Sequence, residues 1–114
     1  MVKYIPKQKD IIYLDFNPTK GHEQSGTRPA LVLSSNKFNK ITNMAIVCPI
    51  TSNTKEFPSH YLLEKTKIIK GSVLCEHVRS IDYTIRNVTY VEKLNDNEFD
   101  NIMQLFNSLF NEAL

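Results

Sequence analysis

The chain has 114 residues, enough for one domain to bury a hydrophobic core without disulfides or a structural metal. With 41% hydrophobic and 23% charged residues, its composition excludes the disordered and membrane-spanning classes. The net charge is only +2, so any nucleic-acid-binding surface must be local. We expect one cytoplasmic domain over residues 1–114 with no membrane partner.

Short strands are predicted along most of the chain. Residues 10–16 are rich in strand formers, 29–34 form a continuous apolar run, and 44–48 form a third strand. Residues 61–63, 72–78 and 87–91 complete a set of about six. This spacing is typical of a small barrel or sandwich and predicts a mainly β fold.

The connection over residues 17–27 is long for a link between neighbouring strands, and long ordered loops are commonly functional. Gly21 and Gly26 permit backbone turns that other residues resist. Between them lie the polar residues His22, Glu23, Gln24 and Ser25. This loop is therefore a candidate part of a site.

An amphipathic helix is predicted at the C-terminal end. Asn95 followed by Glu98 resembles a capping box. Apolar residues then recur at steps of three and four: Phe99, Ile102, Met103, Phe106, Leu109, Phe110 and Ala113. We expect this face to pack on the β core.

Cys48 and Cys75 both lie in apolar runs, which predicts buried free thiols. His22, His60 and His77 are scattered, and no Cys or His pair has zinc-like spacing. We therefore expect neither a metal site nor a cofactor.

Several stretches together resemble the MazF/PemK (Kid) toxin family. They are residues 15–34, which include Arg28-Pro29-Ala30-Leu31-Val32-Leu33, and residues 48–52, 57–58 and 71–82. The resemblance implies a homodimeric SH3-like barrel of about six to seven strands with a C-terminal helix. It also implies a sequence-specific endoribonuclease that cleaves single-stranded mRNA without a metal, inhibits translation and is restrained by an antitoxin protein.

The resemblance assigns catalysis to Arg28 and Thr51, supported by Glu23. RNA carries its own nucleophile, the 2′-hydroxyl, so the protein needs mainly to manage protons and phosphate charge. A guanidinium matches phosphate oxygens and stays charged, so Arg28 would stabilise the five-coordinate transition state and could donate a proton. The neutral hydroxyl of Thr51 would donate to a phosphate oxygen and hold it in line for attack.

The general base is left open. A guanidinium is a poor proton acceptor at neutral pH, so another group would take the 2′-hydroxyl proton. Glu23, Glu76 and His22 are the candidates, and imidazole changes protonation near neutral pH. An exposed loop histidine without a role is an equal alternative for His22.

RNA binding is assigned to His22, Gln24, Glu76, His77 and Arg79. Glu76 and His77 end a predicted strand, where such side chains can read base edges or ribose hydroxyls. Two residues depart from the family pattern: His77 stands where glutamine is frequent, and Lys9 stands where glycine is usual. We expect the first to affect base preference and the second to alter a turn.

Two other functions are compatible with the same barrel. One is a non-catalytic toxin that inhibits DNA gyrase by binding it, which would not need the Gly26-Thr27-Arg28-Pro29 and Pro49-Ile50-Thr51 elements. The other is a plain RNA-binding barrel in which Arg28 and Thr51 only hold phosphate. Turnover of native RNA separates both from an enzyme.

Overall fold

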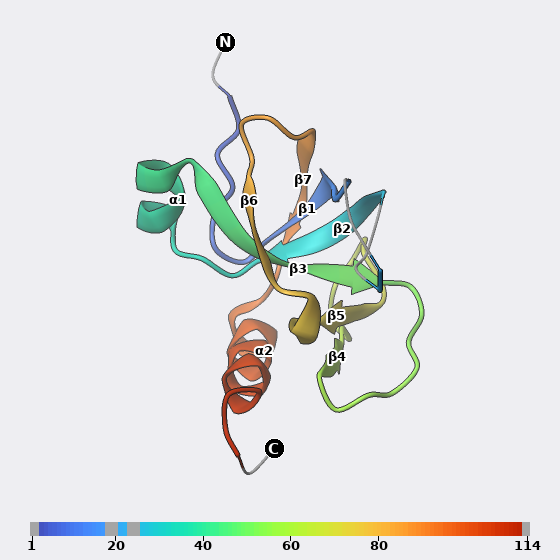
Figure 1. Ribbon diagram of the computed structural model, residues 1–114. Helices are drawn as coiled ribbons and strands as arrows, with labels where there is room; N and C mark the ends of the chain where they lie inside the picture. The colour runs from blue at the N-terminus through green and yellow to red at the C-terminus, as the bar shows by residue number, and fades with distance from the viewer. Residues whose placement is uncertain (1–2, 18–20, 23–25, 113–114) are drawn as a thin grey trace.

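The computed structural model describes residues 3–17, 21–22 and 26–112 (Figure 1). Seven strands form one sheet in which all pairs are antiparallel, in the order β4-β5-β3-β2-β1-β7, with β6 also paired to β3. The strands are β1 (Asp10–Asp15), β2 (Thr27–Val32), β3 (Met44–Thr51), β4 (His60–Leu62), β5 (Ser72–Leu74), β6 (Arg79–Asp82) and β7 (Val88–Lys93). The mainly β prediction is confirmed; the sheet is open, with β4 and β7 at its ends.

The sequence prediction missed one helix and one strand, and it made another strand, β5, too long. The first missed element is α1 (Asn36–Thr42), which begins where the Ser35 hydroxyl accepts a hydrogen bond from the Phe38 N–H and ends at Asn43 in a left-handed conformation. The second is β6. The strand predicted over 72–78 stops at Leu74 because the chain turns into a short 3-10 helix, η1 (Cys75–His77).

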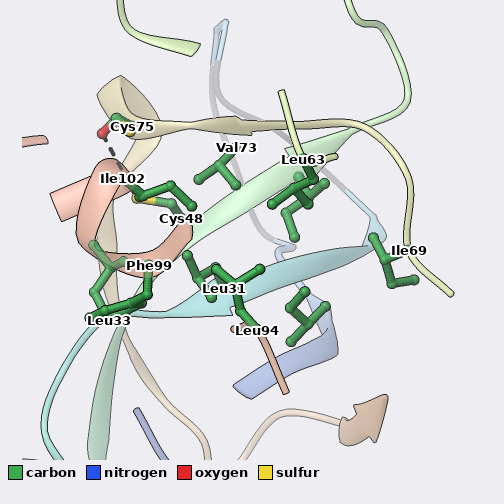
Figure 2. Close-up of a cluster of buried hydrophobic side chains, with 12 residues drawn as sticks. Leu31, Leu33, Cys48, Leu63, Ile69, Val73, Cys75, Leu94, Phe99 and Ile102 are labelled. Carbon is green, nitrogen blue, oxygen red and sulfur yellow. Dashed lines mark hydrogen bonds between the residues drawn. The ribbon is translucent and has the colours of Figure 1, made fainter. Parts of the chain in front are cut away.

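Two hydrophobic clusters lie on opposite faces of the central strands, because alternate residues of a strand face opposite sides. One cluster lies beneath α2 (Asp96–Ser108), and Figure 2 shows Phe99 and Ile102 of this helix directed toward Leu33 and Cys48. The other contains Ile12, Leu14, Phe16, Ala30, Val32, Ala45, Val47, Ile81 and Tyr83. Cys48 and Cys75 are buried free thiols, as predicted.

The predicted C-terminal helix and its cap are confirmed. The Asn95 side chain accepts a hydrogen bond from the Glu98 N–H at 2.8 Å. The predicted apolar face packs on the sheet except at its end, where Phe110 is 76% exposed because it lies beyond the last helical turn. Ala113 lies outside the described residues. Across residues 3–17, 21–22 and 26–112, no helix has the length and apolar character needed to cross a membrane.

Two carboxylates hold the connection between β4 and β5. Glu92 accepts hydrogen bonds from the backbone N–H groups of residues 67–69 at 2.7–2.9 Å. Glu98 accepts from those of Glu64 and Lys65 at 2.9 and 3.1 Å. Burial alone would raise the pKa of both carboxyl groups, but these hydrogen bonds outweigh it and hold each pKa below its usual value.

Lys9 joins three elements at the start of β1. Its φ of 77° is in the left-handed region that favours glycine. Its N–H donates to the Val32 carbonyl at 3.0 Å, and its own carbonyl accepts from the Leu94 N–H at 2.8 Å. Its ammonium group lies 2.9 Å from the Asp96 carboxylate at the start of α2. The departure from glycine therefore keeps a left-handed backbone and adds an ion pair.

Candidate active site

Arg28 and Thr51 lie on the same face of the sheet, at the ends of neighbouring strands. The β2–β3 register places Ala30 opposite Pro49. The β2–β3 pairing ends there, two residues short of Arg28 on β2 and of Thr51 on β3, and Thr51 pairs on the other edge of β3 with Ser72 of β5. Alternate side chains share a face, so Arg28 and Thr51 extend the row begun by Ala30 and Pro49. The fold thus brings together two residues 23 positions apart in sequence.

The Thr51 hydroxyl is oriented by the turn that follows it. Its oxygen accepts a hydrogen bond from the Asn53 N–H at 3.1 Å. Because a hydroxyl both donates and accepts, accepting from the backbone leaves its O–H available to donate. Thr51 is half-buried at the end of β3, and its hydroxyl can therefore donate to a phosphate oxygen.

Gly71 packs directly against the backbone of Thr51. A β-carbon at Gly71 would lie 2.1 Å from the Thr51 carbonyl oxygen, and the glycine adopts a φ of 142°. No other residue type fits there without displacing β3. The close contact with Gly71 therefore fixes the position of the Thr51 backbone.

A pocket of about 240 Å³ opens beside Thr51, on the opposite edge of β3 from β2. Its lining residues come from the loop after β3, the start of β4 and the β5–η1 junction: Thr51, Asn53, Lys55, Glu56, Phe57, His60, Leu74, Glu76 and His77. Two of the predicted RNA-binding residues, Glu76 and His77, therefore lie in the same pocket as Thr51. They lie on η1 and not at the end of a strand, which corrects the sequence prediction.

The carboxylate of Glu76 is held by two side chains. Its Oε1 accepts from the Ser59 hydroxyl at 2.8 Å, and its Oε2 accepts from His60 Nε2 at 2.7 Å. His77 Nε2 lies 3.9 Å from the same Oε2. Burial would raise the pKa of Glu76, but the hydrogen bonds from His60, Ser59 and its own backbone N–H outweigh this and lower it. Glu76 is therefore an ionised acceptor at neutral pH.

The base of the long β1–β2 loop is closed by backbone hydrogen bonds. The Phe16 N–H donates to the Gly26 carbonyl at 3.0 Å, and the Gly26 N–H donates to Asn17 Oδ1 at 3.1 Å. Gly21 and Gly26 have φ values of 62° and 76°, as the sequence led us to expect of turn glycines. The loop thus leaves and rejoins the sheet next to Arg28.

Two arginines hold the same loop base from β6 and the turn before β7. Arg79 Nη1 donates to the Phe16 carbonyl at 3.0 Å, and its guanidinium lies 5.8 Å from the Phe16 ring centre. Arg86 Nη1 donates to the carbonyls of Asp15 and Asn17 at 2.8 and 2.6 Å. Arg79, predicted to bind RNA, therefore also has a local role in fixing the loop.

The remaining predicted residues belong to the loop itself. His22 is exposed within a turn. Glu23 and Gln24 lie outside the described residues. The assignments of Glu23 to catalysis and of His22 and Gln24 to RNA binding therefore stay predictions.

Sequence reasoning missed three contributors to this region: Ser59, His60 and Gly71. The first two belong to Phe57-Pro58-Ser59-His60, which spans the end of the loop after β3 and the first residue of β4. Their partner Glu76 is 16 or 17 residues away in sequence, so no local spacing signals the contact. Gly71 carried a signal, because an isolated glycine immediately before a strand often marks a close backbone approach.

Comparison with known proteins gives a consistent result. Residues 7–110 match the family model described as "PemK-like, MazF-like toxin of type II toxin-antitoxin system". The chain is 39% identical over 87 residues to the endoribonuclease toxin MazF of Escherichia coli K12, covering 76% of this chain and 78% of that protein. It superposes on the crystal structure of MazF (Form-I) from Deinococcus radiodurans with a TM-score of 0.88 and 33% identity, covering 95% and 98% of the two chains. A MazE-MazF structure (Form-II) from the same organism gives a TM-score of 0.82 at 28% identity, covering 96% and 98%.

Proposed function

This chain belongs to the PemK-like, MazF-like toxin family of type II toxin-antitoxin systems, and we propose from this premise that it is an RNA-cleaving toxin centred on Arg28 and Thr51. The observation that supports the proposal is the β2–β3 pairing, which ends at Ala30 and Pro49, two residues from Arg28 and Thr51 on their strands. The endoribonuclease name of the E. coli relative supports the same activity.

The reaction is attack of the 2′-oxygen on the adjacent phosphorus. A bond forms between the 2′-oxygen and phosphorus, the bond to the 5′-oxygen breaks, and that oxygen leaves with a proton as a 5′-hydroxyl. The other product is a 2′,3′-cyclic phosphate, which can open to a 3′-phosphate. Because the nucleophile belongs to the RNA, no metal-bound water is required in this scheme.

Each residue has a separate task in this scheme. Arg28 stabilises the negative charge on the phosphate oxygens in the transition state, where loss of one such donor typically costs about 100- to 1,000-fold in rate. Thr51 donates its O–H to the same phosphate and fixes its orientation. Glu23 is our assignment for supporting Arg28, and Glu23, Glu76 and His22 stay the candidates for accepting the 2′-hydroxyl proton.

Two partners follow from family membership. An antitoxin restrains the enzyme, and the MazE-MazF structures of a relative support such a partner. An acidic antitoxin segment would complement Arg28 electrostatically. The chain acts as a homodimer, which analytical ultracentrifugation of the purified protein tests.

Cleavage of a long defined RNA in EDTA, with both ends of each fragment mapped, tests the proposal. Wild type is expected to cut at a restricted set of sequences and leave 5′-hydroxyl ends. Arg28→Ala should lose about 100- to 1,000-fold in rate, while Lys40→Ala, which removes an exposed charge on α1, should cleave like wild type. A folded wild-type protein that leaves all RNA intact, or that inhibits gyrase without cutting RNA, would refute an endoribonuclease.

A further inference from the structure

Two free thiols lie together where β3 meets the short helix η1. Cys48 belongs to β3, Cys75 is the first residue of η1, and both side chains are fully buried in one hydrophobic cluster. Strands β3 and β5 pair at Ile50 and Val73, each two residues from one of the cysteines. The Cys48 sulfur lies 3.9 Å from the Cys75 carbonyl oxygen (Figure 2). A small movement of the backbone therefore brings the two sulfurs within reach of a disulfide.

The two thiols differ in reactivity. A hydrogen bond between them holds the pKa of Cys75 below its usual value and raises the pKa of Cys48. Burial and the nearby Glu76 charge raise the pKa of Cys48 further, whereas for Cys75 the hydrogen bond outweighs both. Because the thiolate is the nucleophile, Cys75 is the cysteine that attacks an oxidant, and Cys48 is the one that attacks Cys75 in turn.

An oxidant can approach Cys75 through η1. This helix is a single turn of three residues, and no described side chain caps it. Backbone hydrogen bonds hold it at 3.3 Å, from Val78 to Cys75, and at 3.1 Å, from Cys75 to Ser59. Leu74 and Glu76, on either side of Cys75, line the pocket at this edge of β3. Short elements with few hydrogen bonds open locally at lower cost than the whole domain, so a small oxidant in the pocket reaches Cys75 when η1 opens.

We propose that Cys48 and Cys75 form a reversible disulfide when the protein meets a hydroperoxide, and that this bond slows RNA cleavage. The Cys75 sulfur attacks the terminal peroxide oxygen, the O–O bond breaks, and the other oxygen leaves with a proton as an alcohol or water, giving a sulfenic acid. The Cys48 sulfur then attacks the Cys75 sulfur. An S–S bond forms, the S–O bond breaks, and hydroxide leaves as water with the Cys48 proton. The two thiols lose two electrons in total, and the hydroperoxide gains them.

The disulfide acts on the site by displacing η1. Bonded sulfurs lie about 2 Å apart, closer than hydrogen-bonded thiols, so η1 is drawn toward β3. Glu76 directly follows Cys75, and its contacts to Ser59 and His60, at 2.8 and 2.7 Å, are disturbed by this movement. Misplacement of a site by about 1 Å costs about 100-fold in rate. This effect on cleavage rests on the proposed RNA-cleaving function, whereas formation of the disulfide does not.

Treatment of the purified full chain with hydrogen peroxide tests the pair. Mass spectrometry after alkylation of free thiols should show the loss of two hydrogens and no alkylated cysteine. Proteolytic digestion should yield two peptides joined through Cys48 and Cys75. The rate of RNA cleavage should fall about 100-fold, and dithiothreitol should restore both the thiols and the rate.

Replacing Cys48 separates the disulfide from other effects of peroxide. Cys48→Val keeps a buried apolar side chain but removes the second thiol. Before treatment this variant should cleave RNA like wild type, and after treatment it should form no disulfide within the chain and keep its rate. Urea unfolding shows whether the variant is folded, and Cys48→Ala replaces it if valine is not accommodated.

The mass and the cleavage rate distinguish the possible failures. Folded wild type whose thiols both stay free after peroxide, or that forms disulfides only between chains on a non-reducing gel, would overturn the proposed pair. A disulfide that leaves the cleavage rate unchanged would overturn its effect on the site. Protein that forms the disulfide but cuts no RNA even when reduced would refute the enzyme and retain the pair.

Discussion

Replacing Gly71 with alanine is expected to slow RNA cleavage about 100-fold while the chain still folds. The added β-carbon would lie 2.1 Å from the Thr51 carbonyl oxygen and 2.9 Å from its carbonyl carbon, whereas ordinary contacts begin at 3.4 Å. The Thr51 backbone must therefore move by about 1 Å, and misplacement of a reacting group by that much costs about 100-fold. The φ of 142° adds about 1–3 kcal/mol of strain for a non-glycine residue, less than the usual stability of a domain.

Initial cleavage rates at saturating RNA measure the effect, and circular dichroism with urea unfolding measures folding. Asn43→Ala is the matched control, because Asn43 also has a positive φ, 57°, but lies at the end of α1, outside the candidate site. The control should therefore cleave at close to the wild-type rate. Equal rates for folded Gly71→Ala and Asn43→Ala would show that Thr51 does not depend on this contact.

Three other substitutions test how the site is supported. Glu98→Gln should lower the free energy of unfolding by about 1–3 kcal/mol at pH 7. Burial would raise the pKa of Glu98, but its hydrogen bonds lower it, so this contribution is present above the unfolded pKa of about 4.3 and is lost as pH falls through the folded pKa. Urea transitions of wild type and variant should therefore converge in acid, and a constant difference would contradict this. Arg86→Lys keeps the charge but loses the paired contacts to the loop base, so hydrogen exchange over residues 16–26 should accelerate; unchanged exchange would rule out this role. Lys9→Gly should be about 1 kcal/mol more stable than Lys9→Ala in thermal unfolding, because only alanine keeps the left-handed strain, and the reverse order would refute it.

The fold could be predicted where one physical signal was local and strong. The apolar run at 29–34 and the capping pair Asn95 and Glu98 each depend on neighbours in sequence, and β2 and α2 form close to where they were expected. Helix α1 was missed although Ser35 and Asn43 carry its cap signals, because its sequence has little apolar periodicity. The strand expected over 72–78 was too long, because its apolar residues do not reveal the turn into η1.

The candidate site was predictable only in part. Arg28 and Thr51 were assigned through family resemblance, and the pairing of their strands β2 and β3 ends two residues from each of them. The contacts that hold Glu76 could not be predicted, because they join the end of one loop to a 3-10 helix that follows the next hairpin. The local role of Arg79 was hidden for the same reason, since its partner carbonyl belongs to Phe16, 63 residues earlier.

Strand β3 separates two parts of the site that can change independently. Strand β2, which carries Arg28, pairs with one edge of β3, while Phe57, His60 and Glu76 line the pocket on the other. Substitutions in the loop after β3 or in η1 can reshape the pocket without altering the pairing of β2 with β3. Under the proposed function, the pocket can therefore vary between relatives while the strands that carry Arg28 and Thr51 stay the same.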